Sequence, residues 1–539
     1  MSDDGDDPRR TAKQTAGKRD EATQPQKKDP IRRQAVVVVH GQGQQRPMET
    51  LRAIVDGLLP PGAATTANGE PRYYIVPDEL TGSFELHRIT TPTEAAQPGQ
   101  PGNGARKTDF FELYYADLLA DTPFRNLANW LRGLLALPKS AISPSMKQLL
   151  LLVSTVLFLC GLMIIWALLA IPSLMRAQLC LTPVSLIALG AIVPLLAAFA
   201  FLPLVHRWRY SLVALIIFLA NVAIFPTTQI FAPLSLIGLG VYLLFQFGLP
   251  VFGDAAVYLK AQVETVGPRA RIRERGLKLL EGLHNSDRYD RIIIVAHSLG
   301  TVLAYDLLQI FWQRVGPTKL NPPSAAAMRP LRNVRNFVTS NPGDWTPEQR
   351  QKYQDLQWQA FLALGPSRPK PQAEGAVPPS DAETTPNQPW KISDFVSLGT
   401  PLGHARMLIA DGPDHFEKMR VERLLSMSPP VDYDAVNHPE WGFLDEGAKA
   451  THHAAVFSVV RWTNLTDTHE GESFFYSGDF ISSIVGEPDL FGKGIVEKDT
   501  KMRDVPGSGF THGKYWIEIG AKGDETAPEM LRNAVGLKR

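Results

Sequence analysis

Short apolar runs and stretches with helical spacing alternate at both ends of the chain. Residues 36–39 form a continuous β-branched run, which is typical of a strand buried on both faces. Residues 291–296 indicate a second buried strand and residues 395–398 a further strand, and helical patterns separate these runs. The alternation predicts an α/β fold with a mostly parallel sheet. Further strands are expected at 73–76, 84–89, 110–115 and 455–462.

The middle of the chain has a different pattern, because most of the apolar excess lies at 148–253. Residues 149–171 carry no charge and are long enough to cross a hydrocarbon core of roughly 30 Å. Residues 181–205 form a second such run. Residues 210–253 lack Asp, Glu, Lys and Arg and break at Pro226 into two further runs. The pattern predicts about four transmembrane helices, the last two at 210–226 and 232–252.

The charges beside these runs predict an orientation. With four spans, one side of the membrane carries most of the flanking Lys and Arg, and the other carries only Arg176. A positive excess marks the cytoplasmic side. We therefore expect an integral protein of the inner membrane, with the lipid bilayer as a partner and both large polar parts in the cytoplasm. The flanking residues on the cytoplasmic side are Lys139, Lys147, Arg207, Arg209 and Lys260.

Composition narrows the function classes. The formal net charge of +1 gives no reason to expect nucleic acid as a partner. Cys160 and Cys180 both lie in the apolar block, which argues against a disulfide framework and a thiol nucleophile. Residues 1–33 are polar and have no apolar core, so they indicate a disordered tail rather than a secretory signal.

The most specific motif is the junction of a strand and a helix at Ser298. The strand of residues 292–296 leads into Ala296-His297-Ser298-Leu299-Gly300, and a helical pattern follows. Such a tight turn needs small residues on either side of the serine, here Ala296 and Gly300, and it exposes the hydroxyl at the end of the sheet. Ser298 is therefore the candidate nucleophile, and the N–H of Leu299 is a candidate oxyanion donor.

A second motif follows the first predicted strand. The run of valines ends in His40-Gly41-Gln42-Gly43. Glycine lets the backbone approach a substrate closely, so the backbone N–H of Gln42 is the second candidate oxyanion donor. His40 and Gly41 are expected to support this loop.

Together with Ser397-Leu398-Gly399-Thr400-Pro401-Leu402-Gly403, these motifs resemble the α/β-hydrolase superfamily on its lipase and esterase side. The resemblance covers residues 34–120 and 254–520, and the chain looks like bacterial integral-membrane members. It implies an α/β-hydrolase fold split by the inserted transmembrane helices. We expect a tail at 1–33, hydrolase parts at 34–147 and 254–311, the transmembrane insertion at 148–253, a cap-like insertion with a Pro-rich loop at 312–390, and a last hydrolase part at 391–539. Within the cap, Thr346 and Pro347 predict a helix start.

The resemblance also implies a triad in the chain order serine, acid, histidine. His512, the last histidine in the chain and flanked by Gly509 and Gly513, fits the third place. Asp479 is the preferred acid because the apolar residues after it can anchor its loop. Asp467 and Glu470, in a polar loop that we expect to be solvated, remain alternatives. The histidines that come too early, or before the acid loop, are His404, His452, His453 and His469.

These residues predict a serine hydrolase that cleaves carboxylic esters through an acyl-enzyme. Placement near a bilayer is the reason to expect amphiphilic ester or lipid substrates. No cofactor is expected, and no metal, since the histidines lack ligand spacing. Three alternatives stay open: transfer of the acyl group to an acceptor other than water, a hydrolase-like membrane protein that only binds, and a transporter, which the charge-free spans disfavour.

Overall fold

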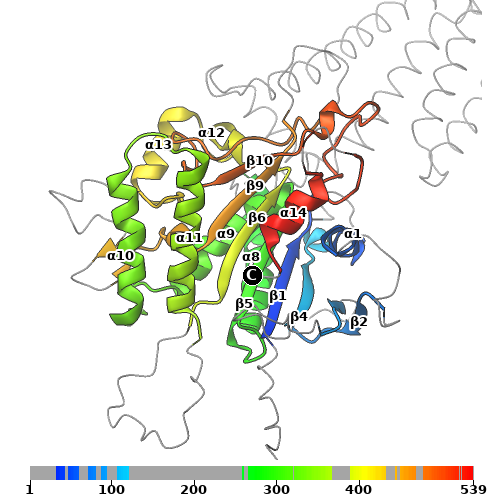
Figure 1. The fold of residues 1–539 in the computed structure, drawn as a ribbon, viewed down its shortest axis with the longest axis horizontal. Coiled ribbons are helices and arrows are strands. Elements are labelled where there is room, and N and C mark those ends of the chain that lie inside the picture. Colours follow the sequence, from blue (N-terminus) through cyan, green and yellow to red (C-terminus); the bar gives the residue numbers. More distant parts are fainter. Residues whose placement is uncertain are drawn as a thin grey trace, which may run out of the picture.

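A computed structural model gives the arrangement of the chain (Figure 1). The structure describes residues 32–42, 46–59, 71–80, 87–93, 106–119, 258–259, 265–319, 321–323, 325–366, 389–431, 444–445, 450–468, 478–520, 523 and 525–537. The predicted tail up to residue 31, the apolar block at 148–253 and the Pro-rich loop of the cap lie outside these residues.

One eight-stranded sheet contains strands from both the N-terminal and the C-terminal parts of the sequence, in the order β10-β9-β6-β5-β1-β4-β3-β2. The first six of these strands are parallel, and β3 and β2 are antiparallel. β1 pairs with β4 on one side and with β5 on the other, so residues far apart in sequence form adjacent strands. The bounds are β1 Arg32–Val39, β2 Tyr74–Pro77, β3 His87–Thr90, β4 Arg106–Leu113, β5 Arg291–His297, β6 Ile392–Leu398, β9 Arg461–Thr466 and β10 Val496–Asp499.

Helices cover both faces of the sheet, which explains why the central strands are apolar on both sides. Val37 and Ile294 belong to the larger core, with α8 (Val266–Asn285), α9 (Leu299–Val315), α10 (Ala325–Ser340) and α11 (Pro347–Leu364). Val36 and Ile293, one residue earlier in each strand, face the second core with α1 (Glu49–Leu58) and α14 (Ala527–Val535). The predicted α/β architecture agrees with this arrangement.

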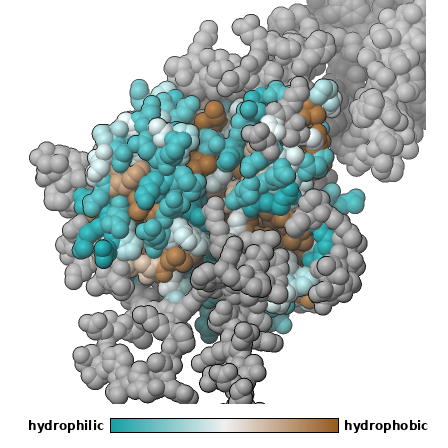
Figure 2. All heavy atoms as spheres, in the orientation of Figure 1, coloured by the Kyte–Doolittle hydropathy of each residue, from teal (hydrophilic) through white to brown (hydrophobic). Residues whose placement is uncertain are grey.

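The remaining short elements lie in the connections. They are η1 (Ala116–Leu118), η4 (Leu402–His404), α12 (Ala405–Leu408), α13 (Pro413–Val421), the pair β7 (Leu444–Asp445) and β8 (Ala450–Thr451), η6 (Val456–Ser458) and η7 (Met502–Asp504). Figure 2 shows hydrophilic side chains over α10 and α11, with hydrophobic residues in small groups on this face.

Two local predictions can be compared with the structure directly. The helix start at Thr346 is confirmed, with Pro347 in the first turn and a capping box between Thr346 and Gln349. The strand predicted at 455–462 is wrong in its first half, where η6 forms and β9 begins only at Arg461. Side chains of α11 bind the carbonyls there: Gln357 Nε2 donates to the carbonyls of Phe457 and Val460.

The predicted transmembrane insertion and the inner-membrane location need correction. No helix among the described residues is long and apolar enough to cross a membrane. The long helix α8 carries charges along its length, such as Arg273 and Glu281, and α9 packs against the sheet. The four predicted spans lie outside the described residues. We therefore withdraw the inserted bundle and the membrane location with its cytoplasmic orientation.

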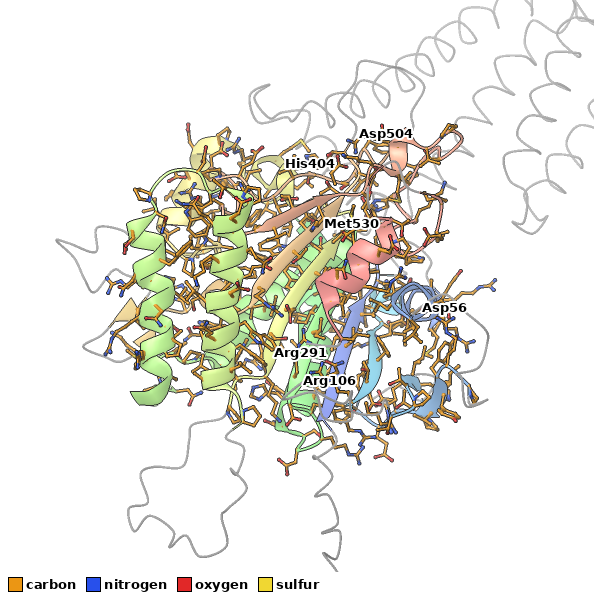
Figure 3. The ribbon with its side chains drawn as sticks, in the orientation of Figure 1. Asp56, Arg106, Arg291, His404, Asp504 and Met530 are labelled. Carbon is orange, nitrogen blue, oxygen red and sulfur yellow. The ribbon has the colours of Figure 1, made fainter. Side chains whose placement is uncertain are left out.

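The two ends of the parallel strands have different chemistry. At the amino ends, Asp394 accepts from Arg291 Nη2 at 2.7 Å and pairs with Arg461 Nη2 at 2.5 Å, and all three side chains are buried. Arg291 also donates to the carbonyls of Val535 and Gly536, which fixes the end of α14. In Figure 3, Arg291 lies at one end of the strands and His404 toward the other, where the candidate site is found.

Candidate active site

Ser298 lies at the sharp turn between β5 and α9. Its backbone has φ 54° and ψ −129°, a conformation that L-residues rarely adopt and that costs free energy. The turn is possible because Gly300 has no side chain: a Cβ there would lie 2.3 Å from the carbonyl oxygen of His40. The strain places the hydroxyl beyond the carboxyl end of β5, at the start of α9.

His512 connects Ser298 with Asp479. Its Nε2 lies 2.8 Å from Ser298 Oγ, and its Nδ1 lies 2.9 Å from Asp479 Oδ2. The carboxylate is fully buried, whereas the imidazole is 12% exposed. The structure thus brings together the three residues that the sequence suggested, in the order hydroxyl, imidazole, carboxylate.

Asp479 is held as a carboxylate by several donors. Its Oδ1 accepts from the backbone N–H groups of Ile481 and Ser482 at 3.0 and 3.1 Å, and its Oδ2 accepts from the Tyr515 hydroxyl at 2.8 Å. Burial by itself raises the pKa of Asp479, but the charge interaction with His512 and these hydrogen bonds outweigh burial and lower it. An ionised Asp479 can orient His512 and stabilise its protonated form.

Asp467, the second candidate acid, bonds to residues other than His512. It is fully buried rather than solvated as predicted, because its oxygens accept from the Thr511 hydroxyl at 2.6 Å and from Arg503 N and Nη1 at 3.1 and 3.2 Å. Its backbone carbonyl accepts from the N–H of Asp479 at 2.9 Å. Asp467 therefore supports the loops that carry the acid and the histidine. Glu470, the third candidate, lies outside the described residues.

The acid loop and the histidine loop are also paired through their backbones. Gly478 N–H donates to Gly509 O at 2.9 Å, and Thr511 N–H donates to Gly478 O at 3.1 Å. Asp479 and His512 each follow one of these bonded residues, so their spacing is fixed by the main chain.

The predicted oxyanion loop lies directly beside Ser298. A Cβ on Gly41 would lie 2.9 Å from Ser298 Cβ, so only glycine allows this approach. Gln42 follows Gly41 and Leu299 follows Ser298, and the backbone N–H groups of these two residues are the candidate donors. They belong to two different segments that the turn at Ser298 brings together.

His40 supports this loop. Its Nδ1 donates to Gly41 O at 2.6 Å, and its Nε2 accepts from Tyr115 N–H at 3.1 Å, which fixes one neutral tautomer. The Tyr115 ring stacks on the imidazole with centroids 4.2 Å apart, and the Tyr115 hydroxyl donates to His40 O. Burial lowers the pKa of His40 to about 4, so the ring remains neutral near pH 7.

Two contributing residues were missed by sequence reasoning. His297 donates from Nε2 to the carbonyl of His512 at 2.7 Å, and burial lowers its pKa to about 3. Tyr515 donates to Asp479. Both are sequence neighbours of triad residues, His297 directly before Ser298 and Tyr515 three residues after His512. Position next to a motif was therefore the available signal.

The other histidines have separate roles or lie outside the described residues. His404 is buried near the acid loop, where Ile481 accepts its hydrogen bond and burial lowers its pKa to about 4. His453 Nε2 contacts Arg423 O, and His452 Nδ1 accepts from Ala454 N–H. His469 is not among the described residues.

Comparisons of the chain with protein-family models, with curated proteins and with solved structures found no match. Among the residues that the structure describes, there is also no group of three His, Cys, Asp or Glu side chains suited to holding a metal ion. Any functional assignment therefore rests on the geometry around Ser298.

Proposed function

We propose that the chain is a serine hydrolase of the α/β-hydrolase type that cleaves carboxylic esters. One observation carries the proposal: the Ser298 hydroxyl, the His512 imidazole and the Asp479 carboxylate form a continuous hydrogen-bonded chain. The strained conformation of Ser298 at a junction of strand and helix adds independent support, because strain of this kind is retained where it positions a reacting group.

The chemistry is acyl transfer through a covalent intermediate. His512 Nε2 takes the proton of Ser298 as Oγ bonds to the ester carbonyl carbon. The bond to the alcohol oxygen then breaks, and the alcohol leaves with the proton from His512. Water attacks the acyl-enzyme by the same route, which releases the acid and restores Ser298. Asp479 keeps the imidazole oriented and stabilises its positive charge during both steps.

The negative charge that develops on the carbonyl oxygen is stabilised by hydrogen-bond donors that are already in place. The N–H of Leu299 is at the start of α9, where the helix dipole contributes a partial positive charge. The N–H of Gln42 lies on the opposite segment, after Gly41. Loss of one such donor typically costs about 100-fold in kcat or more.

The substrate class that we propose is broader than the one that the sequence suggested. The expectation of amphiphilic or lipid substrates depended on placement at a bilayer, which is withdrawn, so carboxylic esters are the class that we retain. The intact hydrogen-bonded chain favours an enzyme over a hydrolase-like protein that only binds. Transfer to another acceptor uses the same residues, and hydrolysis is the simpler proposal because water needs no further binding site.

The test is hydrolysis of p-nitrophenyl esters with acyl chains of increasing length. We expect the native protein to hydrolyse at least one of them, and Ser298→Ala to lose activity by about 10⁴-fold or more. Ser286→Ala is a matched control, because its hydroxyl accepts from Arg288 N–H before β5, at the opposite end of that strand from Ser298. Equal activity of native protein and Ser298→Ala, or no hydrolysis of any ester by folded protein, would overturn the proposal.

A further inference from the structure

Three aromatic rings form a row on the acid and histidine loops. Phe480, which directly follows Asp479, stacks on Phe510 with centroids 4.6 Å apart and planes 23° apart. Phe510 in turn stacks on the His512 imidazole, with centroids 5.7 Å apart and planes 18° apart. The row begins at His512 and reaches solvent, since Phe510 is 44% exposed.

This row of rings lies beside His512, where the alcohol half of a bound ester would be placed. In the proposed reaction, the departing alcohol oxygen receives its proton from His512 Nε2, so it must lie within hydrogen-bond reach of that atom. The carbon chain on this oxygen therefore leaves the reacting centre next to the imidazole. The acyl chain is attached to the other side of the carbonyl carbon, so the proton transfer does not require it to lie near the imidazole.

Phe480 and Phe510 present an apolar face at this place. Aromatic rings prefer stacked or edge contacts with other rings at centroid distances of about 4.5–7 Å, and the row already has this spacing. A further ring placed against Phe510 would cover exposed apolar surface and exclude water from the imidazole, both of which favour binding.

We propose that Phe480 and Phe510 form a binding surface for the alcohol half of the substrate, and that the enzyme favours esters of apolar alcohols, aromatic ones above all. The inference rests on the proposed esterase function. It names Phe510 as the specificity-determining residue, since this ring contacts both His512 and Phe480.

The test compares two pairs of esters at equal concentration. In the first pair the acyl group is the same and the alcohol is benzyl or methyl; in the second pair the alcohol is methyl and the acyl group does or does not end in phenyl. For native protein we expect kcat/KM to be at least ten times higher for the benzyl than for the methyl ester. Phe510→Ala should reduce this ratio to about one-third or less, and Phe510→Trp, which keeps a ring, should retain it.

Leu362→Ala is the control for loss of an exposed apolar side chain, because Leu362 is 60% exposed on α11. It should leave both ratios unchanged. The inference is overturned if Phe510→Ala leaves the alcohol ratio unchanged, or if it lowers only the acyl ratio. In either case the proposed function stands as long as Ser298→Ala abolishes hydrolysis, so the two failures are distinguishable.

Discussion

Thr511 donates its hydroxyl to Asp467 Oδ2 at 2.6 Å, one residue before the histidine that contacts Ser298. The carbonyl of Asp467 also accepts from the N–H of Asp479. A single buried residue thus holds both the acid loop and the histidine loop. The distance between His512 and Asp479 depends on Asp467, although its carboxylate bonds to Thr511 and Arg503 rather than to that pair.

Thr511→Val should therefore reduce catalysis more than binding. The change removes a hydrogen bond to a buried carboxylate, worth about 1.5–3 kcal/mol, so the segment beside His512 is held to the acid loop by backbone bonds without this side-chain contact. We expect kcat to fall roughly tenfold while KM changes less than twofold. Steady-state kinetics with a hydrolysed p-nitrophenyl ester measures both.

Asp499→Asn is the control for this experiment, because Asp499 pairs with the same Arg503 from the end of β10 and leaves the bond between Thr511 and Asp467 in place. It should keep kcat close to the native value. A native kcat in Thr511→Val, or an equal loss in the control, would contradict the role of Asp467 in holding the two loops.

Tyr515→Phe tests how Asp479 is stabilised. The pKa of Asp479 is lowered in the folded protein, so its ionised form adds stability above the unfolded value of about 3.9, and this is lost as pH falls through the lower folded pKa. Removing the Tyr515 hydroxyl raises the pKa of Asp479 and shrinks this contribution. We expect a destabilisation of about 1–3 kcal/mol at pH 7 that becomes smaller below about pH 4.

Urea unfolding of both proteins at pH 7 and in the acid range measures this difference. A destabilisation that is constant with pH would show that Tyr515 acts through packing alone. A destabilisation that grows toward acid would contradict a Tyr515 hydroxyl that stabilises the ionised form of Asp479.

Two glycine variants test the role of the oxyanion loop. In Gly41→Ala the new Cβ would lie 2.9 Å from both Ser298 Cβ and His297 Nδ1, so the loop must move away from the reacting carbonyl. We expect kcat to fall by about 100-fold or more, the size of losing an oxyanion donor. Gly513→Ala is the matched control, because no atom beyond Gly513 and its two chain neighbours lies within 4 Å of the added Cβ. Similar activity of the two variants would argue against the approach of Gly41 to Ser298.

At the other end of the sheet, Asp394→Asn should affect stability without affecting chemistry. The change leaves the guanidinium groups of Arg291 and Arg461 buried without their anion, which typically costs about 3–5 kcal/mol. Asp489→Asn breaks the exposed pair with Arg406 and should cost less than about 1 kcal/mol. Chemical denaturation measures both, and equal losses in the two variants would contradict the burial argument.

Much of the site was predictable because its chemistry requires particular local sequences. Ser298 needed small neighbours in a tight turn. The resemblance to α/β-hydrolases implied the order serine, acid, histidine, in which His512 was the preferred histidine and Asp479 the preferred of three acids. The solvated environment expected for Asp467 was wrong, because its partners Thr511 and Arg503 come from distant segments that only the tertiary fold brings near. The first half of the strand expected at 455–462 was wrong for the same reason, since side chains of α11 bind those carbonyls.

The transmembrane prediction shows a different limit. It relied on the hydropathy of residues 148–253 taken alone, whereas no helix among the described residues is long and apolar enough to cross a membrane. His297 was overlooked because the motif treats its position as variable. Its contact with His512 O forms only when the two loops meet.

In the proposed mechanism, His512 and Asp479 make Ser298 nucleophilic. The rate at which a fluorophosphonate modifies the protein measures this reactivity, and peptide mass spectrometry locates the adduct. We expect one adduct, on Ser298, and a rate at least about 1,000-fold lower in His512→Ala. An adduct on another residue, or an unchanged rate in folded His512→Ala, would contradict this mechanism.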